Sequence, residues 1–142
     1  MTKHLNKIVA NLTLFYTKLH NYHWNVEGKH FFRLHTKFEE LYDDTHERLD
    51  EIAERVLQLG GRPVGTLKDA LNLATLKEAS DKPKSGFEMT QIVVDDLKHL
   101  VNQFKEGIAL ADEASDVATS DILTGAVTHY EKEIWLLSAF LK

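Results

Sequence analysis

The sequence predicts an all-α protein, a four-helix bundle with a short extra helix in the long connection between its second and third long helices. Three observations predict this fold. Apolar residues recur at spacings of three and four in four long stretches, glycine and proline cluster between these stretches, and no stretch alternates as a strand would. The length of 142 residues suits a single domain over residues 1–142.

The four long helices are expected at about residues 2–24, 31–59, 87–111 and 121–141. Gly28 breaks the first stretch, and Gly60 and Pro63 end the second, because glycine suits a left-handed cap and proline cannot continue a helix. The first and second helices, and the third and fourth, have short connections, so each pair should be antiparallel neighbours. The middle connection is long enough to cross the length of the bundle.

Local signals fill in the remaining elements. Thr66, followed by Asp69, predicts the N-cap of the short helix, and Ser85 with Glu88 three residues later fits a capping box for the third long helix. A break between the last two helices is expected near residues 116–120.

The composition excludes several classes of protein. With no cysteine there is no disulfide, thiolate zinc site or iron–sulfur cluster, and the formal charge of -5 argues against a surface made for nucleic acid. No apolar run reaches the length of a membrane span, and the first residues do not resemble a signal peptide. A cytoplasmic protein rich in histidine, with eight of them, is the expectation.

The second long stretch carries a mixed imidazole and carboxylate set typical of transition-metal sites. At about 100° per residue, Glu39 lies about 40°, Asp50 about 60° and Glu54 about 100° from His35, so all four share one helix face. The rise of the helix separates His35 from Asp50 by about 22 Å, so one chain offers two half-sites.

A two-fold axis would unite these half-sites. The pairing of His35 with Glu54 is centred between positions 44 and 45, and so is the pairing of Glu39 with Asp50. Two antiparallel copies of the helix would therefore form two equivalent metal sites at a dimer interface. His23, just before the turn at Gly28, would complete the His35 half.

Asp43 and His46 are symmetric about the same point, and we interpret them as a polar pair across the axis. The alternative for the whole face is a solvated, ion-paired helix surface, which charged residues at a spacing of four usually form.

The motifs H-W-N-V-E-G at 23–28, F-F-x-L-H at 31–35, F-E-x-x-Y at 38–42, D-x-I-A-E-R at 50–55 and L-G-G-x-P at 59–63 resemble the Dps family of ferritin-like mini-ferritins. The resemblance covers essentially the whole chain and implies a ferritin-like bundle, a hollow homododecamer and ferroxidase centres between two-fold related subunits. The only Glu-x-x-His, Glu27 to His30, falls in a turn, so the di-iron motif of a site within one bundle is missing.

The resemblance assigns the five candidate ligands to two subunits. One supplies His23, His35 and Glu39, where many members have Asp, and its partner supplies Asp50 and Glu54. Each centre would hold two irons, with zinc as an alternative occupant, and would oxidise Fe(II) with hydrogen peroxide in preference to dioxygen. Ferric mineral would collect in the shell, which protects against oxidative stress.

Other residues receive roles by the same resemblance, each with a simpler alternative. Asp112, Asp116 and Asp121, with Glu113, match the region that lines an iron-entry pore, but Asp116 or Asp121 could instead cap a helix. Trp24 would take up stray oxidising equivalents, or would simply pack in the core.

DNA binding is expected to be weak or absent. The first seven residues carry only two lysines, and the chain is net acidic. The main alternative function is nevertheless a DNA-compacting stress protein in which metal is secondary, and a purely structural bundle is a third possibility.

Overall fold

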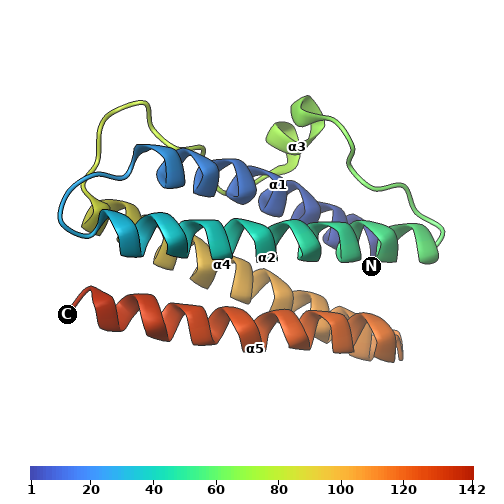
Figure 1. Ribbon diagram of the computed structural model, residues 1–142. Coiled ribbons are helices and arrows are strands. Elements are labelled where there is room, and N and C mark those ends of the chain that lie inside the picture. Colours follow the sequence, from blue (N-terminus) through green and yellow to red (C-terminus); the bar gives the residue numbers. More distant parts are fainter.

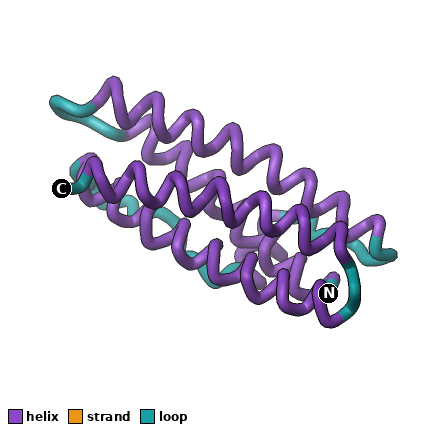
Figure 2. Tube along the Cα trace, turned by 90° about the horizontal axis from the view of Figure 1, so that it is seen from below, coloured by secondary structure: helices purple, strands orange, loops and turns teal.

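The computed structural model describes residues 1–142, and it contains five helices and no strand (Figures 1 and 2). The helices are α1 (Thr2–Asn25), α2 (Phe31–Gln58), α3 (Leu67–Leu73), α4 (Gly86–Glu113) and α5 (Val117–Phe140). The predicted four-helix bundle with a short extra helix is confirmed.

The bundle consists of two antiparallel hairpins, α1 with α2 and α4 with α5, as the short connections predict (Figure 1). Gly28, in the turn between α1 and α2, and Gly60, just after the end of α2, have positive φ angles of 97° and 78°. Glycine adopts this left-handed region without the steric cost that a Cβ atom would bring. The connection from α2 to α4 returns along α1 and carries α3 with it.

The apolar stripes of all four long helices meet in one core. Phe15 of α1, Phe38 of α2, Phe104 of α4 and Tyr130 of α5 are fully buried there. The Tyr130 hydroxyl lies 3.3 Å from the Thr45 hydroxyl of α2, so the single polar atom of this ring finds a partner inside the core.

The long connection is fastened to the bundle by one buried amide. The Asn11 side chain of α1 donates to the Gln103 and Thr75 side chains at 2.8 and 2.9 Å. Its oxygen accepts from the backbone N–H groups of Thr75 and Leu76 at 2.7 and 2.9 Å. Asn11 therefore fixes the place where the connection crosses α1, and with it the position of α3.

The helix caps that the sequence indicates are present in the structure. Thr66 accepts from the Asp69 N–H, and Ser85 with Glu88 forms the predicted capping box. The break expected near 116–120 lies slightly earlier, at residues 114–116, because Asp116 is itself the N-cap of α5 and residues 117–120 form the first turn of that helix.

A buried ion pair joins α1 to α4. Lys18 Nζ lies 2.7 Å from Asp96 Oδ2, and both side chains are nearly excluded from solvent. Burial raises the pKa of Asp96 even though Lys18 favours the charged form. Removing one partner would leave the other charge buried and unpaired.

We expect the Asp96→Ala variant to lose about 3–5 kcal/mol of unfolding free energy, because Lys18 would remain buried without a counter-charge. Glu131→Ala, which breaks the exposed pair with Lys105, is the control and should cost less than about 1 kcal/mol. Urea unfolding at a fixed protein concentration measures both. Equal losses would show that the buried pair has no special importance.

Candidate metal centre

Two histidines, His23 and His35, join the end of α1 to the start of α2 by hydrogen bonds. The Nδ1 atom of His23 lies 2.8 Å from the backbone oxygen of His35, and Nδ1 of His35 lies 2.7 Å from the backbone oxygen of His23. The two rings stack with their centroids 3.7 Å apart and an angle of 17° between their planes. The turn through Gly28 brings the two helix ends together for this exchange.

These hydrogen bonds fix the tautomer of both rings. A carbonyl oxygen can only accept, so Nδ1 of each ring must carry the hydrogen. In the neutral imidazole, Nε2 is then the nitrogen with a free lone pair, which is the form that ligates a metal. The hydrogen bonds within a single chain therefore hold both predicted histidine ligands in one orientation.

Aromatic rings and a carboxylate surround this pair. Phe31 stacks on His35 at 4.9 Å, and Tyr42 meets His23 edge-on at 5.3 Å. The Tyr42 hydroxyl donates to Glu39 at 3.2 Å, and burial together with the Glu39 charge raises the pKa of Tyr42. The role of Tyr42 in orienting Glu39 was missed from the sequence, although the spacing of three residues on one helix was a usable signal.

The other two predicted ligands, Asp50 and Glu54, are exposed side chains at the far end of α2. Because α2 is one uninterrupted helix from Phe31 to Gln58, His35 and Asp50 are about 22 Å apart along its axis. Within one chain, no group of three or more histidine and acidic side chains is arranged to hold a metal ion. A single copy thus presents two incomplete halves on one helix face.

The residues near the centre of this face are also on the surface. Asp43 and His46 are exposed, and the His46 ring lies 5.9 Å from that of Tyr16.

His20 of α1 stacks on Tyr42 at 3.8 Å, and its Nδ1 atom is buried without a hydrogen-bond partner. Burial, and then the nearby His23, lower the pKa of His20, which favours the neutral ring.

Trp24 does not pack in the core. Its side chain is 69% exposed, and its ring lies 5.1 Å from His20. The core-packing alternative is therefore wrong, and Trp24 lies on the surface directly after the candidate ligand His23.

The acidic residues around the junction of α4 and α5 differ in their contacts. Asp116 accepts from Arg55 of α2 at 2.7 Å and from the Thr119 side chain and backbone, so the capping alternative holds for it. The Thr119 hydroxyl, then its backbone N–H and Arg55, lower the pKa of Asp116. Asp112, Glu113 and Asp121 are exposed.

The remaining histidines have structural contacts that the sequence did not reveal. His4 Nε2 donates to the Gln103 backbone oxygen at 2.8 Å, and His99 pairs with Thr75 at 2.8 Å. His129 lies 3.3 Å from Asp44, and the His30 ring packs edge-on against Phe87 and Phe140.

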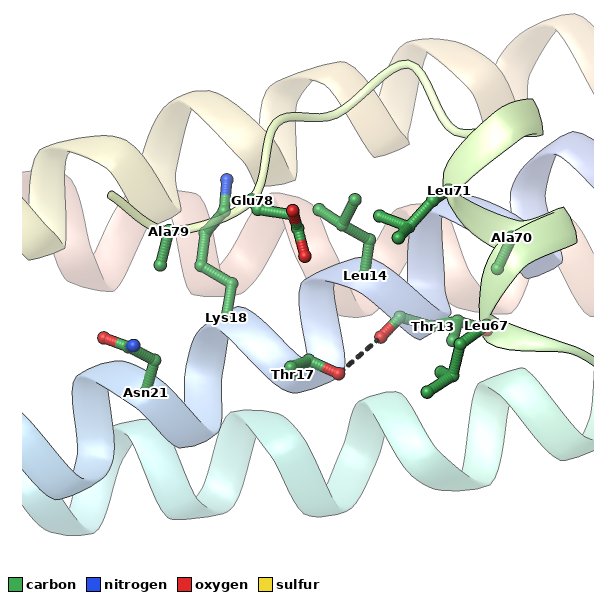
Figure 3. Close-up of a pocket in the computed structure, with 10 residues that line it drawn as sticks. All are labelled: Thr13, Leu14, Thr17, Lys18, Asn21, Leu67, Ala70, Leu71, Glu78 and Ala79. Carbon is green, nitrogen blue, oxygen red and sulfur yellow. Dashed lines mark hydrogen bonds between the residues drawn. The ribbon is translucent and has the colours of Figure 1, made fainter. Parts of the chain in front are cut away.

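A cavity of about 220 Å³ lies between α1 and α3, away from this centre (Figure 3). Leu14, Leu67, Ala70, Leu71 and Ala79 form its apolar wall, and none of the five candidate ligands lines it. Its one basic residue, Lys18, is already paired with Asp96. The cavity offers no comparable set of metal ligands.

Comparisons with known proteins agree with this architecture. A family model described as a ferritin-like domain matches residues 2–142. The DNA protection during starvation protein of Brevibacillus brevis is 48% identical over 97% of this chain and 92% of its own length.

Two solved structures are similar over 99% of the chain. A Dps protein from Bacillus brevis, covered over 94% of its length, has a TM-score of 0.97 at 47% identity. The Dps protein from Vibrio cholerae, covered over 88%, has a TM-score of 0.96 at 39% identity and is described as a member of a broad superfamily of ferritin-like diiron-carboxylate proteins.

We expect Asp116→Ala to lower the unfolding free energy by about 1–2 kcal/mol, because α5 loses its N-cap and Arg55 loses its carboxylate. Asp112→Ala, which changes an exposed acid, should stay within about 0.5 kcal/mol of the unchanged protein. Since the pKa of Asp116 is lowered, its stabilisation is present above the ordinary Asp pKa and is lost as the pH falls through the lowered value. Urea titrations at several pH values measure this, and a constant difference at acidic pH would contradict the assignment.

Proposed function

The chain belongs to the Dps family of ferritin-like proteins, and on this basis we propose that it is a ferroxidase and iron store. Fe(II) is its substrate, and it is oxidised at centres shared between two copies of the chain. The observation that carries this proposal is the His23–His35 pair, whose hydrogen bonds leave Nε2 of each ring free as a metal ligand.

Each centre would draw its ligands from two copies. One copy contributes His23, His35 and Glu39, and the second contributes its Asp50 and Glu54. The symmetric spacing on α2 supports this arrangement, because a single two-fold axis between positions 44 and 45 pairs His35 with Glu54 and Glu39 with Asp50. The incomplete halves within one chain are consistent with it.

The chemistry follows from this ligand set. Neutral imidazoles and carboxylates bind two Fe(II) ions, and the carboxylates offset the charge that grows on oxidation. Each Fe(II) gives up one electron, and hydrogen peroxide takes up both electrons and two protons, so its O–O bond breaks and two water molecules form. Each peroxide molecule accepts two electrons, whereas a one-electron reduction would release a hydroxyl radical. The pairing of two Fe(II) ions therefore suppresses radical formation. Dioxygen is the slower alternative oxidant.

Iron storage requires a closed protein shell and a path by which Fe(II) enters it. We propose that twelve copies form a hollow shell that collects the ferric product, and that exposed Asp112 and Asp121 line an entry path whose negative field concentrates Fe(II). Asp116 supports this path indirectly, because its contacts with Arg55 and Thr119 fix the start of α5 beside it.

DNA compaction is the second candidate function, because a relative that is 48% identical is named for the protection of DNA during starvation. The net charge of -5 opposes it, since affinity for DNA comes mainly from basic groups that neutralise phosphates. We therefore propose that any protection of DNA comes from the removal of Fe(II) and peroxide.

Mixing inactive variants tests the shared centre. His35→Ala and Glu54→Ala should each oxidise Fe(II) poorly when alone. Refolded together in equal amounts, they should recover about a quarter of the original activity, because half of the pairs are mixed and each mixed pair holds one intact centre out of two.

The matched control mixes His35→Ala with His23→Ala. Both changes fall in the same half of the centre, so no mixed pair contains an intact site and no recovery is expected. Recovery in the control, or none in the test pair, would contradict the shared centre. The assay follows Fe(III) absorbance after peroxide is added to anaerobic Fe(II)-loaded protein.

A gel-shift titration separates the two candidate functions. We expect retention of DNA only at low salt, with loss of binding at physiological salt, because the acidic chain makes few phosphate contacts. Tight binding at physiological salt by the His35→Ala variant would instead favour compaction of DNA as the main function.

A further inference from the structure

Two large apolar side chains lie at the ends of the ligand-bearing face of α2. Phe32 is 83% exposed and Leu57 is 57% exposed. Single exposed apolar residues are common, so exposure alone carries no argument. The positions of these two residues on the helix carry the argument. Counted from His35 at about 100° per residue, Phe32 lies at about 60° and Leu57 at about 40°, within the arc of the candidate ligands.

The two residues obey the same symmetry as the ligands. The midpoint of positions 32 and 57 falls between 44 and 45, as do those of the pairs His35 with Glu54 and Glu39 with Asp50. Phe32 lies three residues before His35, and Leu57 lies three residues after Glu54. Each polar half of the face therefore has one exposed apolar residue on its outer side.

Phe32 is also the last ring of a continuous aromatic row that begins at the candidate ligands. The ring centroids of His23 and His35 are 3.7 Å apart, those of His35 and Phe31 are 4.9 Å apart, and those of Phe31 and Phe32 are 5.4 Å apart. The row ends in solvent at Phe32, which leaves a large apolar surface uncovered directly beside the metal ligands.

We infer that Phe32 of one copy packs against Leu57 of the second copy at each end of the two-fold interface, forming an apolar contact that closes the outer side of each metal centre. This inference rests on the proposed antiparallel pairing, and the occupant of the exposed surface is a second copy of this chain. An apolar wall beside a metal site limits the access of water to it. The contact also favours this register of the two helices, because a slip along the axis would separate Phe32 from Leu57.

The absence of cysteine from the chain makes the contact directly testable. In the Phe32→Cys/Leu57→Cys variant, a short bismaleimide should link two copies into a covalent dimer. Each single variant should stay unlinked, because two copies of the same position would be about 38 Å apart along antiparallel helices. Both side chains are exposed, so these changes leave the bundle core intact.

The matched control is Phe32→Cys/Glu51→Cys. Glu51 is exposed and lies about 160° from His35, away from the shared face. We expect no link in this control, and denaturing gels read out all variants. Equal linking in the control would overturn the inference, since the pairing would then lack a defined register.

The outcomes separate this inference from the proposed function. If the mixed variants described above regain activity while the 32/57 double variant stays unlinked, the apolar contact is wrong and the shared centre stands. If the double variant links and the mixed variants stay inactive, the contact is supported and shared oxidation is wrong.

A second measurement tests the role of the contact. Phe32→Ala should shift the dissociation of the two-fold pair by about tenfold toward single copies, because a buried aromatic side chain is lost, whereas Phe32→Leu should retain most of the affinity. Sedimentation across a dilution series measures both, and an unchanged equilibrium in Phe32→Ala would overturn the inference.

Discussion

The reciprocal hydrogen bonds between His23 and His35 are the constraint on which the candidate centre depends. They hold the end of α1 against the start of α2 and require Nδ1 of each ring to be the donor, so that Nε2 is left with the free lone pair in the neutral ring. The left-handed turn at Gly28 allows the two backbones to meet, and the Phe31 and Tyr42 rings pack around the pair. The fold of a single chain thus arranges both candidate histidine ligands.

The rest of the centre depends on the length and straightness of α2. A helix of 28 residues carries His35 and Glu39 near one end and Asp50 and Glu54 near the other, and its length keeps the two groups apart within one copy. The same stiffness makes a symmetric pairing effective, because the ligand pairs and the Phe32 and Leu57 pair share one centre. Assembly and chemistry are then proposed to depend on the same helix face.

Much of the fold could be predicted because its signals are local. Apolar periodicity located the long helices, and the side chains of Thr66, Ser85 and Glu88 marked helix starts that the structure confirms. Asp116 shows the limit of local reasoning: its capping role was one of the alternatives that the sequence offered, but its ion pair with Arg55 depends on α2, 61 residues earlier in the chain. The tautomers of His23 and His35 and the exposure of Trp24 could not be predicted either, because each depends on how α1 lies against α2.

The most direct test of the shared centre is to locate the metal itself. Crystals soaked with zinc, whose anomalous scattering marks its position, should show two equivalent sites for each two-fold pair. Each site should lie between Nε2 of His23 and His35 in one copy and the carboxylates of Asp50 and Glu54 in the other. Metal held within one bundle, or bound without the carboxylates of the second copy, would contradict the account.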